Sequence, residues 1–280
     1  MRHKPMLAYP VSDKPINYDG KVFMQPKLDG VRCLIQYDKK TGVTAWSRTG
    51  KQWKNIHHIT SSLEQWFQSN QTTVLDGELY NHDLRDDFET IISLVRRQDP
   101  DDIDMLESRD LVQFHCYDII HPDNSPFEDR NRFIKYCVNE TDYVKLVSTM
   151  LCDSDEDAKE IHAVNLECGF EGSILRTNDV YHQKRTHSLR KFKDFHDAEA
   201  LIVDWVEGKG KRVGTIGKFM AQDEDGNLFG MPVMDNFKYL QDNFKAMQGY
   251  VGKTATFTYF ERTKANSYRH PLFKCIRDYE

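Results

Sequence analysis

Alternating apolar and polar positions mark the first structured stretch of the chain as β-rich. Three short runs, rich in branched and aromatic side chains, lie between residues 21 and 47: VFMQP (22–26), VRCLIQY (31–37) and VTAWS (43–47). Runs of this length, separated by turn residues such as DKKTG, are typical of strands. We therefore expect a meander of strands here, with Lys27 at the end of the first strand.

Helical spacing of apolar positions dominates from residue 76 to about residue 160. The segments DDFETIISLVRR (86–97) and DSDEDAKEIHAVNLECG (153–169) predict amphipathic helices, and the apolar run LVQFHCYDII (111–120) predicts a strand between them. Strands resume at EGSILR (171–176) and SLRKFKDF (188–195). This mixture predicts an α+β domain, residues 1–195, built of antiparallel sheets with flanking helices.

A different rhythm follows over residues 196–280. Strand-like runs alternate with turns: AEALIVDWVE (198–207), TIGKFMAQ (215–222), LFGMPV (228–233) and TATFTYFE (254–261). DEDGN (223–227) predicts a hairpin turn, and a short helix is expected around residues 236–245. This series of short strands with one inserted helix in about 85 residues predicts a C-terminal OB-fold β-barrel.

Composition excludes several classes of protein. The chain has 280 residues, is 39% hydrophobic and 29% charged, and carries a net charge of −6, which does not indicate a uniformly basic nucleic-acid binder. Its 6 cysteines include no CxxC pair, so neither a zinc knuckle nor a disulfide scaffold is expected. No stretch approaches the ~20 apolar residues of a membrane span, and no signal peptide is evident. We expect a cytoplasmic protein, in the host cytoplasm if the protein is viral, with no membrane partner.

Lys27 is the first candidate for covalent chemistry. It lies at a predicted strand end in the segment Lys27–Arg32 (KLDGVR), where Gly30 allows a close backbone approach. By itself this short pattern also suits a hairpin turn with two solvated charges. Further motifs follow along the chain: Ser47–Gly50 (SRTG), Leu75–Leu79 (LDGEL), Phe114–Asp118 (FHCYD), Glu171–Arg176 (EGSILR) and Leu189–Lys193 (LRKFK).

In this order the segments resemble motifs I, Ia, III, IIIa, IV and V of the covalent nucleotidyltransferase superfamily, which comprises ATP-dependent DNA ligases, RNA ligases and mRNA capping enzymes. The resemblance runs from Lys27 to about Phe195. VEGKGK (206–211) and RHPLFKCIR (269–277) further resemble the OB domain of small phage and bacterial ATP-dependent DNA ligases. The RxDK form of the last motif, found in larger ligases, is absent.

The resemblance implies a role for each matching residue, with ATP and Mg²⁺ as cofactors. It makes Lys27 the nucleophile and assigns Lys191 and Lys193 to bind the phosphates and Gln25 and Tyr117 to bind the base. Arg32 and Arg48 would bind the ribose or the 5′-phosphate of the nucleic acid, and Arg269 or Arg277 would bind the pyrophosphate. Glu78 would bind the ribose or the metal, and Glu171 would bind the metal. These residue types suit the chemistry, because cations stabilise a transferring phosphoryl group and carboxylates bind Mg²⁺. Strand alternation would place Lys191 and Lys193 on one face, with Phe192 opposite.

Basic residues gather in two places that suit a DNA backbone. Lys184 and Arg185 precede the last motif, and Lys209, Lys211 and Arg212 lie in the first predicted hairpin of the C-terminal domain. Residues 76–160 carry a net charge of −14, the rest of the first domain +8, and residues 196–280 none. We therefore expect the acidic middle stretch to face away from DNA and the basic segments, with Arg48, to contact it.

The resemblance thus implies an ATP-dependent DNA ligase that seals nicks in duplex DNA through a lysyl-AMP and a DNA-adenylate. A monomer is expected. Only 26 residues precede Lys27, so both domains are expected to bind the duplex. An RNA ligase, a capping guanylyltransferase and a non-catalytic OB-type nucleic-acid-binding protein remain open as alternatives.

Overall fold

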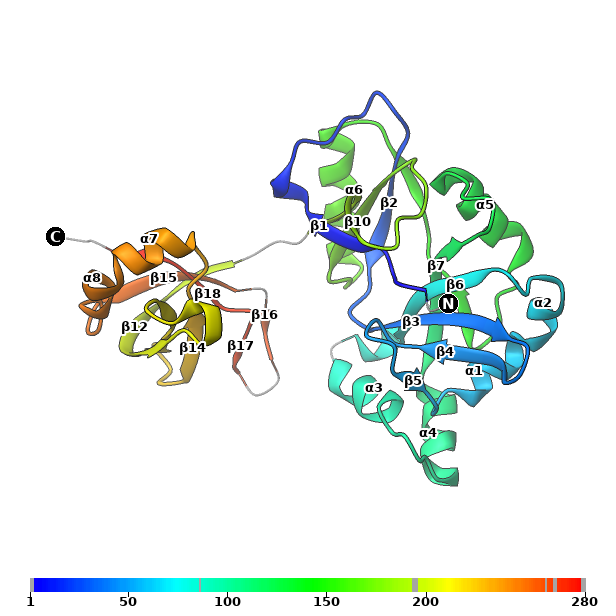
Figure 1. The fold of residues 1–280 in the computed structure, drawn as a ribbon, viewed down its shortest axis with the longest axis horizontal. Helices are drawn as coiled ribbons and strands as arrows, with labels where there is room; N and C mark the ends of the chain where they lie inside the picture. The colour runs from blue at the N-terminus through cyan, green and yellow to red at the C-terminus, as the bar shows by residue number, and fades with distance from the viewer. Residues whose placement is uncertain (1–2, 86, 193–195, 260, 264–265, 278–280) are drawn as a thin grey trace. The chain divides into compact units, whose positions relative to one another are not determined.

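The chain divides into two compact units, Met1–Phe192 and Lys193–Glu280 (Figure 1). The computed structural model describes residues 3–85, 87–192, 196–259, 261–263 and 266–277. The division falls three residues before the boundary expected from the sequence, and residues 193–195 lie outside the described ones.

Two sheets form the first unit, which has the expected α+β character. Sheet I has the strand order β1 (Leu7–Pro10), β11 (Arg185–Phe192), β10 (Gly172–Thr177), β2 (Val22–Lys27) and β9 (Met150–Cys152). Sheet II has the order β5 (Gln52–Trp53), β4 (Gly42–Trp46), β3 (Val31–Asp38), β6 (Val74–Tyr80), β7 (Gln113–Ile120) and β8 (Val144–Leu146). The pairs β1–β11 and β7–β8 are parallel, and the other described pairs in these sheets are antiparallel.

The expected meander is wrong in one respect, because β2 does not pair with β3. β2 pairs with β9 and β10 in sheet I, whereas β3 pairs with β4 and β6 in sheet II. The chain crosses between the sheets at residues 28–30, where a Cβ on Gly30 would lie 2.4 Å from the carbonyl oxygen of Leu79. Alternation along a strand reveals its two faces but not its neighbours, so the sequence could not show this crossing.

Helices cover the outer faces of both sheets. They are α1 (His57–Ser62), α2 (Glu64–Ser69), α3 (Phe88–Val95), α4 (Asp102–Leu111), α5 (Phe127–Cys137) and α6 (Asp155–Glu167). The main core joins sheet II to α1, α2, α3 and α5, and a smaller core joins sheet I to α6. In β2, Val22 and Met24 pack toward α6, so the alternate positions Gln25 and Lys27 face sheet II.

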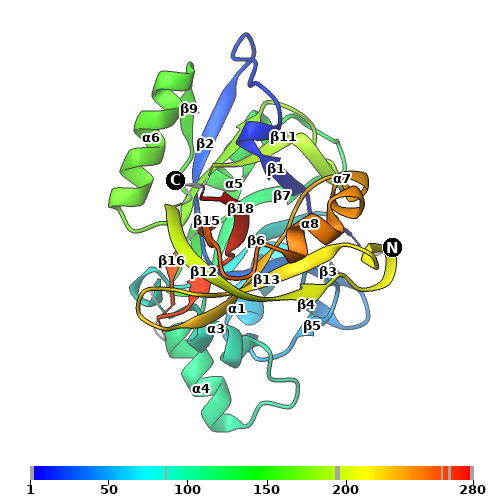
Figure 2. The same cartoon turned by 90° about the vertical axis from the view of Figure 1, so that its left-hand side faces the viewer.

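The second unit contains sheet III, with the strand order β14 (Leu228–Pro232), β13 (Ile216–Gln222), β12 (His196–Glu207), β15 (Thr254–Tyr259) and β18 (Leu272–Ile276). The end strands β14 and β18 lie against one another, so the sheet curls toward a barrel with the strand order of an OB fold. Figure 2 shows α7 (Phe237–Asp242) and α8 (Phe244–Gln248) in orange, where the sequence predicted a single helix. β16 (Glu261–Arg262) and β17 (Tyr268–Arg269) form a separate pair.

Among the described residues, no helix is both long and apolar enough to cross a membrane.

Candidate active site

A cavity of about 260 Å³ opens between sheets I and II of the first unit. Eight of the residues singled out in the sequence line it: Gln25, Lys27, Arg32, Arg48, Glu78, Tyr117, Arg185 and Lys191. They come from segments spread over more than 160 positions of the chain, and the fold brings them to one hollow.

Lys27 and Glu171 meet at the edge of this cavity. Lys27 ends β2, Glu171 directly precedes β10, and the antiparallel register places Lys27 opposite Gly172. The Nζ of Lys27 forms an ion pair with the Glu171 carboxylate, and the side chains are 21% and 4% exposed. The register of two strands therefore holds an amine and a nearly buried carboxylate in contact.

Glu78 lies within β6. Its strand partner is Arg32 in β3, and alternation places Glu78 on the same face as Asp76, toward sheet I. Burial raises the pKa of Glu78 to about 7, although the charges of Arg32 and Lys27 and a hydrogen bond from Tyr117 lower it. The carboxyl group of Glu78 therefore changes its protonation state near pH 7.

One edge of the Arg32 guanidinium is hydrogen-bonded to other residues of the protein. Its Nε and Nη2 donate to the carboxylate of Asp76 at 2.6 and 2.5 Å, and Nη2 also donates to the carbonyl of Met6 at 3.1 Å. Asp76 additionally accepts a 2.6 Å hydrogen bond from the hydroxyl of Tyr181. Through its bond to Met6, Arg32 holds the N-terminal segment in place, and Leu7 of this segment lines the cavity.

Tyr117 lies at a β-bulge. In the pairing of β6 with β7, Asp76 lies opposite Asp118 and the next residue, Gly77, lies opposite Cys116. Tyr117, between Cys116 and Asp118, is therefore the extra residue of β7 that has no partner in β6. The bulge directs Tyr117 and Asp118 to the same side. The hydroxyl of Tyr117 donates to Glu78 at 3.1 Å, and the guanidinium carbon of Arg32 lies 5.1 Å from the centre of its ring.

Cations line the opposite wall. Lys191 lies in β11, where burial lowers its pKa and the charges of Lys27 and Arg185 lower it further. Phe192 stacks on His162 of α6 with ring centres 4.1 Å apart, so neighbouring side chains of β11 alternate as expected. Lys193 lies outside the described residues. Lys184 and Arg48 line a second hollow beside the cavity.

A family model decides where this chain belongs: the model for the ATP dependent DNA ligase domain matches residues 5–193. The chain is a member of this ligase family. The DNA ligase of Thermococcus fumicolans is 22% identical over 236 residues, which are 79% of this chain and 42% of that protein. The DNA ligase of African swine fever virus (isolate Tick/South Africa/Pretoriuskop Pr4/1996) is 25% identical over 205 residues, 69% and 46% of the two chains. This chain therefore spans less than half the length of these two curated relatives.

Solved structures of ligases have the same fold. A Lig E DNA ligase superimposes with a TM-score of 0.77 at 23% identity, covering 99% of this chain and 100% of that one. The ATP-dependent DNA ligase of bacteriophage T7 in complex with ATP superimposes with a TM-score of 0.54 at 18% identity, covering 98% of both. These likenesses support the predicted arrangement of an α+β unit followed by an OB fold.

The carboxylates of this ligase domain fit a magnesium ion held together with a nucleotide. Among the residues that the structure describes, no three His, Cys, Asp or Glu side chains form a metal-binding group. Mg²⁺ is usually bound by one or two carboxylates together with phosphate oxygens and waters. Glu78, whose ionised form burial disfavours, and Glu171 supply such carboxylates, and a nearby cation would stabilise both.

The remaining predicted site residues described by the structure belong to the second unit. Lys209 and Lys211 are exposed in the turn that follows β12. Arg212 donates to the carbonyl of Val233 at 2.8 Å, so part of its guanidinium stabilises the unit itself. Arg269 lies in β17.

Three buried charges of the ligase domain escaped the sequence analysis. Asp118, Arg130 and Arg176 are less than 4% exposed, and both arginines donate to the carboxylate of Asp118. Asp118 and Arg176 each end a recognised motif, so a charge in an otherwise apolar strand was the available signal. Arg130 lies in an amphipathic segment and gave none.

Proposed function

We propose that this chain is an ATP-dependent DNA ligase that seals 5′-phosphate/3′-hydroxyl nicks in duplex DNA. The observation that carries the proposal is the position of Lys27. Its amine contacts Glu171, and it lines the same cavity as Glu78 and Lys191. A lysine amine held this way suits attack on a phosphorus atom.

In the first step, the Nζ of Lys27 attacks the α-phosphorus of ATP. A P–N bond forms, the bond to the bridging oxygen breaks, and pyrophosphate leaves. Glu171 orients the amine and is placed to accept its proton. We assign Lys191, which lines the cavity, and Lys193 to the phosphates, and the aromatic face of Tyr117 to the base. Magnesium, bound through Glu78 and Glu171, would neutralise charge on the phosphates.

In the next two steps the adenylate moves to DNA and leaves. An oxygen of the 5′-phosphate attacks the lysyl-AMP phosphorus, the P–N bond breaks, and the amine of Lys27 is restored. The 3′-hydroxyl then attacks the activated 5′-phosphate, loses its proton and expels AMP. Arg48, exposed at the cavity mouth, is placed to bind the DNA phosphate in both steps.

The same proposal assigns the two domains. Residues 1–195 carry adenylation, and residues 196–280 hold the duplex through the exposed Lys209 and Lys211, with Arg269 at the pyrophosphate. Lys184 and Arg185 extend this DNA contact on the first domain. The enzyme acts as a monomer in the cytoplasm, and its free thiols fit a reducing compartment.

The test is sealing of a 5′-labelled nicked DNA duplex with ATP and Mg²⁺. We expect a full-length labelled strand from the wild type and none from Lys27→Arg, which keeps the charge but is not an effective nucleophile at neutral pH. Failure on nicked DNA with success on a nicked RNA duplex would make the chain an RNA ligase. A requirement for GTP in place of ATP would point to a guanylyltransferase.

A further inference from the structure

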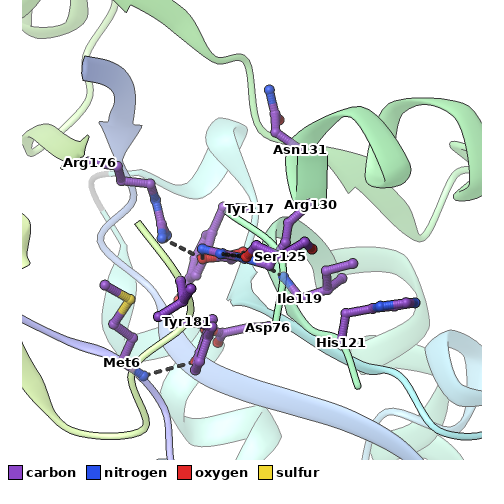
Figure 3. A network of polar contacts seen from close by, with 12 residues as sticks. Met6, Asp76, Tyr117, Ile119, His121, Ser125, Arg130, Asn131, Arg176 and Tyr181 are labelled. Atoms are coloured by element: carbon purple, nitrogen blue, oxygen red, sulfur yellow. Dashed lines mark hydrogen bonds and ion pairs between the residues drawn. The ribbon is translucent and has the colours of Figure 1, made fainter. Parts of the chain in front are cut away.

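A buried group of charges surrounds Asp118, and one of its members, Arg176, lines the cavity. Figure 3 shows Arg130 and Arg176 of this group. Asp118 is 0% exposed and accepts hydrogen bonds from two guanidinium groups, those of Arg130, which is 1% exposed, and Arg176, which is 3% exposed. Arg130 donates through Nε at 2.8 Å and Nη2 at 3.1 Å. Arg176 donates through Nη1 at 2.6 Å. Two cations thus share one buried carboxylate.

A second buried cation needs a reason, because taking a charge out of water is costly unless its partners compensate. Arg130 has a structural reason. Its Nη1 donates to the carbonyls of Ser125 and Asp179 at 2.6 and 2.9 Å. Arg130 therefore connects the loop before α5 to the loop after β10. Arg176 makes different contacts, since its Nε donates to the side-chain oxygen of Gln25 at 2.7 Å.

Gln25 carries this contact across to the bulge in sheet II. With its oxygen on Arg176, its Nε2 donates to the carbonyl of Tyr117 at 3.1 Å and to the hydroxyl of Thr149 at 2.9 Å. Both amide hydrogens are therefore used within the protein. The side chain of Gln25, which also lines the cavity, therefore connects two elements of the cavity wall.

Arg176 thereby contacts both sides of the cavity wall. Gln25 lies two residues before Lys27 on the same face of β2, and Asp118 directly follows Tyr117 in β7. The guanidinium carbon of Arg176 also lies 5.5 Å from the centre of the Tyr117 ring. One side chain therefore links the strand of the amine to the bulge that carries the aromatic ring.

We propose that Arg176 is a positioning residue for self-adenylation: by holding Gln25 and Asp118 together, it sets Tyr117, and through it Glu78, at the distance from Lys27 that attack on ATP requires. The inference rests on the proposed function. A misplacement of about 1 Å can cost roughly 10²-fold in rate, so loss of this link is expected to affect chemistry more than folding.

Two matched variants test the assignment. Arg176→Gln and Arg130→Gln each remove one guanidinium from Asp118 and leave it the other guanidinium and the backbone N–H of Ile119. We expect Arg130→Gln to unfold at lower urea concentration than Arg176→Gln, because it loses more contacts, yet to form enzyme-AMP at a rate within about threefold of wild type. Arg176→Gln should slow single-turnover enzyme-AMP formation by roughly 10- to 100-fold at saturating ATP.

Arg176→Lys guards against loss of folding. It keeps a cation beside Asp118 but lacks the planar fork that reaches Gln25 as well, so we expect native-like stability with the same slow adenylation. Rates that follow stability across the three variants, with Arg130→Gln slowest, would overturn the proposal.

A double-mutant cycle with Gln25→Ala separates positioning from direct contact with ATP. If Arg176 acts through Gln25, Arg176→Gln should cost little further rate in the Gln25→Ala background. Losses that multiply would overturn the link. Wild-type adenylation is measured first: its absence counts against the proposed function, whereas a normal wild-type rate with the wrong variant pattern counts only against the role of Arg176.

Discussion

The hydroxyl of Tyr117 donates a 3.1 Å hydrogen bond to Glu78, which joins an aromatic ring from β7 and a carboxylate from β6 into one wall of the cavity. The ring matches an aromatic position of the ligase motifs, but the hydroxyl does something a phenyl ring cannot. It stabilises the ionised form of a carboxylate whose pKa burial raises to about 7.

Tyr117→Phe removes this hydroxyl and keeps the ring. The pKa of Glu78 should then rise further, because a hydrogen bond to the charged form is lost. Since the proposed reaction uses ionised Glu78, the acid limb of enzyme-AMP formation should move to higher pH by roughly half a unit to one unit. Rates of enzyme-AMP formation measured from about pH 5.5 to about pH 9 check this prediction. An acid limb at the same pH in both proteins would show that the hydroxyl does not act on Glu78.

Glu78→Gln should stabilise the fold at high pH. The pKa of Glu78 lies at about 7 in the folded protein and at 4.5 ordinarily, so the folded state binds this proton more tightly. The free energy of unfolding therefore falls as pH rises from about 4.5 through about 7. At about pH 8.5 the amide should raise it by on the order of 1–3 kcal/mol, and by much less at about pH 5. Urea titrations in EDTA measure both values; destabilisation at each pH would contradict the burial argument.

Gly30→Ala should disturb the crossing between the two sheets. The added Cβ would lie 2.4 Å from the carbonyl oxygen of Leu79 and 2.7 Å from Cγ of Glu78, so backbone and carboxylate must both shift. We expect a loss of about 1–3 kcal/mol in the free energy of unfolding, together with slower enzyme-AMP formation.

Gly20→Ala is the matched control, because a Cβ there meets no atom within 4 Å. It should leave stability and adenylation within error of wild type or slightly raise stability. Equal losses in the two variants would show that the close approach at Gly30 has no special cost.

Binding to a nicked duplex should weaken as salt rises, since it depends on phosphate contacts. Lys209→Ala and Lys211→Ala should each reduce the slope of log K against log salt by about 1. Lys39→Ala, which removes another exposed lysine in the turn between β3 and β4, should leave the slope unchanged. Fluorescence anisotropy at several salt concentrations gives the slopes, and three equal slopes would exclude the hairpin as a DNA contact.

Local pattern and motif order predicted most of the elements near the cavity. The strands of residues 22–27, 31–38 and 42–46 and the helices α3 and α6 lie where alternation and helical spacing put them, because burial of one face imposes those periods. The order of motifs pointed to Lys27, Glu78, Tyr117 and Lys191, which the fold brings to one cavity. Their individual roles stay predictions.

What the sequence could not predict depends on long-range pairing. The bulge at Tyr117 arises from the register between β6 and β7, and no local signal distinguishes it from a regular strand. The same holds for the crossing at Gly30. The orientation of the Gln25 amide follows from Arg176, which lies 151 positions away in the chain. A resemblance assigns such a residue to a ligand, whereas its contacts show what it supports.

The most direct measurement for the central claim is covalent labelling with α-labelled ATP and Mg²⁺, followed by denaturing electrophoresis and mapping of the labelled peptide. The wild type should retain label on the peptide that contains Lys27 and lose it when nicked DNA is added. Lys27→Ala should retain none. Absence of label in the wild type, or equal label in Lys27→Ala, would contradict the account.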